Sequence, residues 1–327
     1  MQWLLRGLFA LLVGSAPLVG GSTALAADAV IAPDPGISSV PGLGGLTALG
    51  GTIVWVSGPS AGAQRLMERT PTGVIVPVAG AAPAFRYVSP DLGRDRAGRL
   101  VLTYIRCNGT PPGRVRCVSR RDDLRGHSAS FPGLAPKGCT VGPVAVWRAR
   151  TAYSLFCVRA GRVDDRRSGL YVKSGTRAAR RLALPAGIVR ARLPELNSID
   201  LRGRRVGGIA CDCDISFHAF AEDLDGRNGI SFPVAASDGD SSGDAPGLAL
   251  GPAGTLWALA VDQGGGSTET RIMRASGTRC IQSELMVSPP GDERPAAVDL
   301  AVDGQALYLA SPGIGITEHV FAPERPC

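Results

Sequence analysis

Short apolar runs recur along the chain at intervals of about fifty residues, and each meets a tight turn from which a second apolar run leaves. Six such pairs lie around residues 46–56, 95–102, 146–156, 201–210, 248–259 and 300–309. Short apolar runs bounded by Gly, Asp and Arg turns are typical of antiparallel β-hairpins. A repeat of this length is typical of one blade of a β-propeller. The pattern predicts an all-β protein, a six-bladed β-propeller.

Further apolar or mixed runs follow three of the hairpins. Residues 65–70, 170–175 and 271–277 read alike and are predicted third strands, and residues 74–78 and 181–184 are predicted fourth strands. Each blade is therefore expected to hold about four antiparallel strands.

The last unit stops after residues 317–321, its predicted third strand, whereas residues 29–32 have no hairpin partner. The N-terminal run is therefore predicted to supply the missing fourth strand of the last blade. Closure of this kind removes the open sheet edges that a linear array would expose.

The first residues read as a secretory signal peptide. Arg6 is followed by an apolar stretch over residues 7–19 and by the small residues Ala24-Leu25-Ala26, which match an A-x-A cleavage site. Residues 1–26 are thus predicted to be removed, which leaves residues 27–327 as a single β-propeller domain. No later apolar run reaches the roughly 20 residues that a membrane span requires. The sequence predicts a secreted or extracytoplasmic protein without a membrane span.

The composition of the chain indicates what its core is made of and which classes of binding partner are expected. Apolar residues make up 44% of the chain and aromatic residues only 5%, so the predicted core is built from Val, Leu, Ile and Ala. The net charge of +7 comes from 33 arginines and 2 lysines, a bias typical of a GC-rich bacterial genome. The basic stretches over residues 114–125, 177–192 and 202–205 lack the interleaved aromatics of a base-stacking surface. They are predicted to be solvated blade edges, and no nucleic acid partner is expected.

Eight cysteines in an exported chain predict a disulfide framework. Cys107 ends one predicted strand and Cys117 begins the next, across a loop that contains Pro and Gly. Cys139 and Cys157 lie nearly opposite each other across a turn near residue 148. Both spacings suit the short Cβ separation of a disulfide, so both pairs are predicted.

The other four cysteines are harder to pair. Cys280 and Cys327 lie in the fifth and sixth units, so a bond between them would fasten the ring near its seam. Cys211 and Cys213 share one strand face and could form a small strained ring, a redox-active pair or half of a zinc site. No second C-x-C or C-x-x-C motif completes four zinc ligands. A structural Cys211–Cys213 bond is the default prediction.

One motif matches a serine hydrolase. Gly58 to Gly62 reads G-x-S-x-G, and His319 lies late in the chain, where an α/β-hydrolase places its histidine. A nucleophile elbow needs a helix directly after it, but residues 64–70 read as a strand. A chance match is favoured, and no catalytic residue is predicted.

A second motif resembles the start of a calcium loop. Asp238, Asp240 and Ser242 place oxygen-bearing side chains at positions 1, 3 and 5, and glycine follows at position 6. Position 12 is Ala249 instead of an acidic residue, and no helix flanks the loop, so only half of the motif is present. The candidate metal ligands are Asp238, Asp240 and Asp244. Calcium is the one cofactor considered, and the default is none.

The hairpins at residues 251–257 and 303–309, with the six-unit spacing, resemble the TolB-like six-bladed propeller superfamily. The resemblance implies that ligands meet the loops that join one blade to the next at the mouth of the central channel. The residues predicted at this position are Arg86, Tyr87, Arg192, Glu195, Asn197, Asp238, Asp240, Asp292, Glu293 and Arg294. Lactonase-type relatives hold a metal in the channel, but their ligands have no residue-by-residue match here.

These observations favour a secreted, non-enzymatic binding or interaction module that is a monomer. Its partner is expected to be a protein, a glycan or a small-molecule ligand at the channel face. The alternative is a metal-dependent hydrolase or lactonase that uses acidic residues at the channel mouth. A third hypothesis is attachment to the cell envelope through the arginine surface, with a steep dependence on salt.

Overall fold

The computed structural model describes most of the chain after residue 28. The described ranges are 29–37, 45–58, 64–82, 85–108, 116–131, 133–185, 188, 195–212, 216–236, 242–264, 267–276, 280–286 and 295–321. The predicted signal peptide and its cleavage site lie outside these residues.

Four antiparallel sheets of four strands each occur in the described ranges. The first contains β2 (Leu46–Leu49), β3 (Thr52–Ser57), β4 (Arg65–Arg69) and β5 (Ile75–Pro77). The second contains β15 (Glu195–Arg202), β16 (Arg205–Asp212), β17 (Ser216–Asp223) and β18 (Ile230–Ala236). The third contains β19 (Ser242–Leu250), β20 (Leu256–Gly264), β21 (Ser267–Ala275) and β22 (Ile281–Met286), with the short 3-10 helix η1 (Pro252–Gly254) between β19 and β20.

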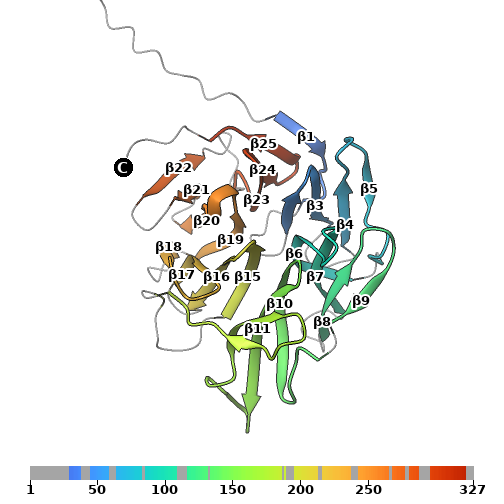
Figure 1. Cartoon of the computed structure of the whole chain (residues 1–327). Helices are drawn as coiled ribbons and strands as arrows, with labels where there is room; N and C mark the ends of the chain where they lie inside the picture. Colours follow the sequence, from blue (N-terminus) through green and yellow to red (C-terminus); the bar gives the residue numbers. More distant parts are fainter. Residues whose placement is uncertain are drawn as a thin grey trace, which may run out of the picture.

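The fourth sheet joins the two ends of the described chain. It contains β23 (Asp299–Asp303), β24 (Ala306–Ser311), β25 (Gly315–His319) and β1 (Ala29–Pro33), in the order β1-β25-β24-β23. β1 runs antiparallel to β25, with Ala29 opposite Glu318 and Pro33 opposite Gly315 (Figure 1). The prediction that residues 29–32 supply the missing strand of the last unit is confirmed by this pairing.

A nine-stranded sheet contains the second and third units of the sequence repeat. Its strands are β6 (Arg86–Arg94), β7 (Leu100–Asn108), β8 (Arg116–Asp122), β9 (Ser128–Ser130), β10 (Cys139–Trp147), β11 (Arg150–Arg159), β12 (Arg162–Val163), β13 (Gly169–Ser174) and β14 (Arg180–Arg181). The two units meet where β6 and β10 run parallel, with Trp147 opposite Arg94.

The first strand of every unit lies next to the first strand of the following unit. β2 packs against β6, β6 against β10, β10 against β15, β15 against β19, and β19 against β23, while β23 packs against β2. We call these six strands the inner strands, and Figure 1 shows the sheets arranged around them. The fold is therefore all-β and propeller-like, with blades of about four antiparallel strands.

Apolar side chains fill the space between the faces of neighbouring sheets. One buried cluster takes Ala152, Leu170 and Val172 from the third unit and Leu201, Val206 and Phe220 from the fourth. Packing of this kind suits small aliphatic residues, because alternate side chains of a strand point to opposite faces of the sheet. No helix in the described ranges is long and apolar enough to cross a membrane.

Two predicted disulfides are present. Cys107 bonds to Cys117 and Cys139 bonds to Cys157, and each pair lies directly opposite across two strands. Cys280 is also disulfide-bonded. Its predicted partner Cys327 lies outside the described residues, as does the predicted Cys211–Cys213 bond.

Loss of the Cys139–Cys157 bond is expected to destabilise the fold measurably. The bond joins residues 18 apart in sequence, and a crosslink over a loop of this length stabilises by about 3 kcal/mol, mainly through the unfolded chain. The variant with Cys139→Ala and Cys157→Ala should lose this amount in urea unfolding. Added reductant should lower the stability of this variant less than that of the wild type. A loss well under 1 kcal/mol would contradict the expectation.

Candidate functional site

Irregularities interrupt four of the inner strands at a similar level. The pairing register shifts between Val88 and Asp91 in β6, and comparable shifts occur in β10, β15 and β19. Pro90, Pro143 and Pro246 lie within three of the shifts. Proline has no N–H to donate to the strand ladder, so it favours a bulge at these positions.

A cavity of about 510 Å³ lies among the inner strands, and we call it the chamber. All six inner strands contribute to its wall, including the bulge residues Ser89, Pro90, Gly142, Pro143 and Asn197. Apolar side chains form much of the wall, among them Val88, Ile105, Leu155, Leu196 and Leu248. Its size lies in the range of small-molecule sites, about 300–1,000 Å³.

Asp91 on β6 is a buried wall residue with an unused acceptor. It is only 6% exposed, and its Oδ2 has no hydrogen-bond partner among the described residues. Asp200 and Arg202 of β15 are the charged groups that act on it. Burial, and then the Asp200 carboxylate, raise the pKa of Asp91 well above its ordinary value, although Arg202 lowers it. An acceptor of this kind in a cavity wall is suited to a ligand that donates a hydrogen bond.

Arg202 forms the partition at the inner end of the chamber. Its Nε donates to Asp200 Oδ1 at 3.2 Å, and its Nη2 donates to the Ala48 carbonyl at 2.9 Å. Burial alone would lower the pKa of Arg202, but Asp200 and then Asp91 raise it above its ordinary value. Arg202 also lines a second cavity of about 750 Å³, together with Trp147, Arg204 and Arg205. The Arg202 side chain thus lies between the two cavities.

Other polar side chains tie one inner strand to the next. Asp299 Oδ2 accepts from Leu46 N at 2.8 Å, and Asp200 Oδ2 accepts from Leu250 N at 2.7 Å. Burial raises the pKa of Asp299 to about 8, although the N–H groups of Leu300 and Leu46 lower it. These carboxylates accept backbone N–H groups of neighbouring inner strands, whereas Oδ2 of Asp91 accepts no hydrogen bond from the described residues.

The outer end of the chamber is polar and aromatic. Arg86 lies five residues before Asp91 on the same strand, and its buried Nε has no hydrogen-bond partner among the described residues. Ser89 Oγ donates to the Asn197 carbonyl at 2.9 Å, which links β6 to β15 across the opening. Phe156 also lines the chamber and is 48% exposed.

The loop residues predicted as ligand contacts have different environments. Arg86 and Asn197 line the chamber. Tyr87 does not line it: its ring is fully buried, packs edge-on against Tyr104 at 5.5 Å between centroids, and its hydroxyl donates to the Ala82 carbonyl. Strand alternation explains this, because Arg86 and Val88 face the chamber and Tyr87 must face the other side. Arg192, Asp292, Glu293, Arg294 and the side chain of Glu195 lie outside what the structure describes.

The side chains of the three predicted metal ligands all lie outside the described residues. Asp238 and Asp240 lie outside the described residues, and Asp244 lies in β19 opposite Val261, with its side chain outside the description. Among the His, Cys, Asp and Glu side chains of the described ranges, no group of three could hold a metal ion.

The segment after the G-x-S-x-G motif is the strand β4, as predicted, and not the helix of a nucleophile elbow. His319, the histidine of the same motif match, contacts Glu284 Oε1 at 2.8 Å.

Sequence reasoning missed the buried carboxyl groups of the chamber. Asp91, Asp200 and Asp299 are each followed by leucine and lie on the inner strands of the second, fourth and sixth units. This Asp-Leu repeat at intervals of about two units is a signal that could have found them.

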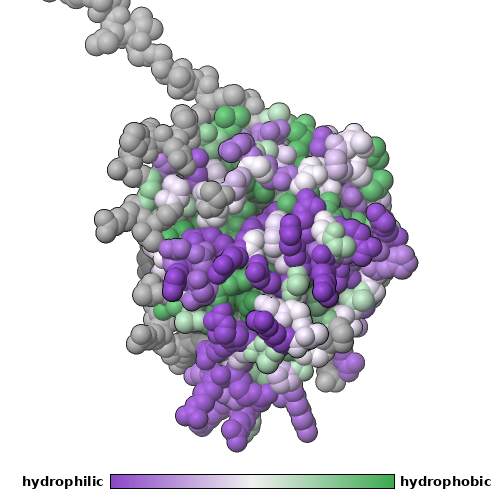
Figure 2. Space-filling model, viewed as in Figure 1, coloured by the Kyte–Doolittle hydropathy of each residue, from purple (hydrophilic) through white to green (hydrophobic). Residues whose placement is uncertain are grey.

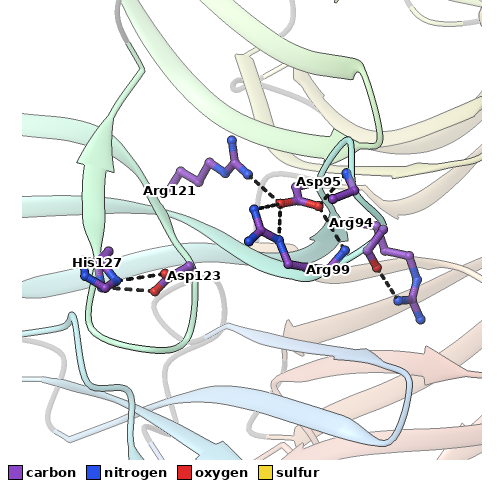
Figure 3. Close-up of polar contacts among 8 residues, drawn as sticks. Arg94, Asp95, Arg99, Arg121, Asp123 and His127 are labelled. Atoms are coloured by element: carbon purple, nitrogen blue, oxygen red, sulfur yellow. Dashed lines mark hydrogen bonds and ion pairs between the residues drawn. The ribbon is translucent and has the colours of Figure 1, made fainter.

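Arginines on the turns are partly neutralised by aspartates. Figure 2 shows hydrophilic residues gathered around the middle of the face in view, over β6, β10 and β15. At the β6–β7 turn, Asp95 Oδ2 lies 2.8 Å from Arg99 Nη2 and 3.6 Å from Arg121 Nη2 (Figure 3). Arg121 is 42% exposed, as predicted for a solvated edge over residues 114–125. The same prediction for residues 202–205 is wrong at Arg202 and Arg205, whose side chains are only 14% exposed and pair with Asp200 and Asp223.

Comparison with known proteins finds structural similarity only. No family model matches the chain, and no curated protein matches its sequence. The solved structures that it resembles include TolB from Acinetobacter baumannii, with 13% identity, a TM-score of 0.41, and coverage of 74% of this chain and 55% of TolB. They also include puromycin hydrolase, with 14% identity, a TM-score of 0.43, and coverage of 89% and 54%. The SapL1 lectin, in complex with alpha methyl fucoside, has 11% identity, a TM-score of 0.47, and coverage of 86% and 94%.

The predicted resemblance to TolB is thus confirmed as a structural likeness. The chain spans only about half the length of TolB and of puromycin hydrolase.

Proposed function

We propose that this protein is an extracytoplasmic binding protein whose small organic ligand occupies the chamber on the axis of a six-bladed ring. The nine-stranded sheet then counts as two blades, whose strands β6 and β10 share the ladder pair Trp147 and Arg94. The contact of β23 with β2 and the pairing of β1 with β25 support closure of the ring. The disulfides and the signal-like residues 1–26 support export from the cytoplasm.

Asp91 carries the proposal, because it lines the chamber and its buried Oδ2 has no hydrogen-bond partner among the described residues. A buried acceptor without a partner costs stability, which a ligand that donates to it would recover. Binding is favoured over catalysis because the Asp200 and Asp299 carboxylates accept backbone N–H groups and are not free to act as bases. The apolar walls would hold the carbon skeleton of the ligand.

A side chain that fills the chamber mouth should abolish binding. Asn197 is exposed and lines the chamber, so Asn197→Trp should block entry with little cost to the core. Compounds from a small-molecule library that raise the melting temperature of the wild type should no longer do so for this variant. Gln305→Trp, at the exposed β23–β24 turn, is the matched control and should respond like the wild type. Compounds that stabilise Asn197→Trp equally, or a library without any binder, would refute the proposal.

The metal-dependent hydrolase stays a prediction that rests on Asp238, Asp240 and Asp244. On that hypothesis, calcium should raise the melting temperature of the wild type, and the variant with Asp238→Ala and Asp240→Ala should lose the effect. Absence of bound divalent metal in the purified protein, together with no thermal shift, would count against it.

A further inference from the structure

Two titratable residues line the chamber from the same strand, and each has one buried atom without a hydrogen-bond partner among the described residues. Oδ2 of Asp91 lies in its wall, and Nε of Arg86 lies five residues earlier on β6. Both atoms are buried. The Asp91 oxygen is an acceptor and suits a ligand group that donates a hydrogen bond, whereas the Arg86 nitrogen is a donor and suits a ligand group that accepts one.

The inner end holds two carboxyl groups and one cation. The Arg202 donors are directed to Asp200 Oδ1 and to the Ala48 carbonyl. Asp200 Oδ2 is satisfied by Leu250 N, so Asp91 is the carboxyl that lacks a donor. When Asp91 is ionised, the group carries one more negative than positive charge, and a cation bound at Asp91 would balance it.

An organic ammonium suits this end better than a metal ion. Divalent ions bind several oxygen ligands at once, and no group of three His, Cys, Asp or Glu side chains in the described ranges could hold one. An ammonium needs one strong acceptor and tolerates apolar neighbours such as Leu248 and Ala249 around its carbon chain.

The outer end offers a cation to an anionic group. Arg86 has no ion pair within the described ranges, and its Nε is buried beside the chamber wall. Arginine is well suited to hold a carboxylate with directed hydrogen bonds. Between the two ends the wall is apolar, with Val88, Ile105 and Leu196 among its residues.

We propose that the chamber recognises a zwitterionic molecule, with its ammonium at Asp91, its carboxylate at Arg86 and an apolar segment between them. This inference rests on the proposed function and names the ligand class of the same chamber. Five strand residues span about 16 Å of backbone at most, and the bulge shortens this, so the two ligand groups should lie less than about 16 Å apart.

Binding of the ammonium should release a proton. Burial and then the Asp200 carboxylate raise the pKa of Asp91 well above its ordinary value, which favours the protonated form. An ammonium favours the ionised carboxylate, so affinity should rise with pH while the amine remains charged. The charged groups that face the chamber are Arg86 of β6, Asp200 and Arg202 of β15, and Asp299 of β23. The wall residues contributed by β2 and β10, residues 46–48 and 140–143, do not titrate.

A ladder of straight-chain ω-amino acids with four to twelve carbons tests the proposal by titration calorimetry. Affinity should peak at an intermediate length, and the best member should bind at least about tenfold more tightly than the amine, acid and alcohol of equal chain length. Measurement in buffers of different ionisation enthalpy should show proton release. No measurable binding across the ladder, or equal affinity for the matched alcohol, would overturn the inference.

Charge-removing variants assign the two ends. Asp91→Asn should erase the preference for the amine and the proton release, whereas Arg86→Gln should erase the preference for the carboxylate. Arg204→Gln, in the second cavity, is the matched control and should change neither. Neutral library compounds that bind the wild type but not Asn197→Trp would preserve the proposed function even if the zwitterion preference fails. Retention of both preferences in both variants would refute the inference.

Discussion

Deletion of residues 27–36 is expected to destabilise the protein by several kcal/mol and to make it aggregate. β1 supplies the fourth strand of the last sheet, and its loss exposes the edge of β25. The deletion also removes Asp34, whose Oδ2 accepts from Nε1 of Trp55 at 2.7 Å. Trp55 is 1% exposed, so its indole N–H would be left buried without that acceptor, at a cost of about 1–3 kcal/mol.

The matched control is a chain that begins at residue 27. Urea unfolding and light scattering should show this shorter chain to be stable and monomeric, while the chain that begins at residue 37 unfolds at lower urea and associates. Equal stability of the two chains would show that β1 does not close the ring.

Stability is expected to fall steeply as pH rises from 5 to 9. The pKa of Asp299 is raised to about 8, above an unfolded value of about 3.9, so the folded state binds more protons in this window. The contribution is complete below the unfolded pKa and is lost as pH rises through the folded pKa. Three pH units correspond to a loss on the order of 4 kcal/mol. Asp91, and Glu222 with its pKa raised to about 7, act with the same sign because burial dominates both.

Asp299→Asn isolates the largest part of this effect. The amide oxygen can still accept from one of the two N–H groups that Asp299 binds, that of Leu46 or that of Leu300, and the side chain no longer titrates. Urea unfolding at a series of pH values should show a shallower slope for this variant, which should become the more stable protein near pH 9. Asp95→Asn is the control: hydrogen bonds from Arg99 outweigh burial and lower the pKa of Asp95, so it stays ionised throughout. Equal slopes for Asp299→Asn and the wild type would refute the assignment.

Local sequence pattern predicted the hairpins well. Apolar runs that meet at glycine-containing turns place their residues opposite each other, as the two-residue turn at Gly50 and Gly51 does between β2 and β3. The pairing of residues 29–32 with the last unit followed from counting strands, and the disulfides at Cys107 and Cys139 followed from adjacent strands. Hairpins and these disulfides depend on strands that are adjacent in sequence, and the pairing of residues 29–32 depends on the number of strands that each repeat unit contains.

The residues that line the chamber could not be predicted from the local sequence pattern, because they come from strands far apart in the sequence. Tyr87 was predicted to contact ligand and instead packs in the core, because the register of β6 turns Arg86 and Val88 inward. Asp91 and Asp200 are more than one hundred residues apart and meet only because β6 and β15 face the same cavity. Their pKa values and hydrogen bonds are set by that meeting.

By itself, the sequence determined the strand repeat, the hairpin turns and the cysteine pairs across neighbouring strands, because these follow from side-chain alternation and turn chemistry over short stretches of chain. Tertiary structure alone decided which carboxyl groups are buried and which of them the backbone satisfies. It also decided that Asp91 and Arg86 line one chamber, where Oδ2 of Asp91 and Nε of Arg86 lack hydrogen-bond partners among the described residues. The physical reason is that burial and register shifts at the bulges act between strands distant in sequence, and they decide which face of each inner strand meets the axis.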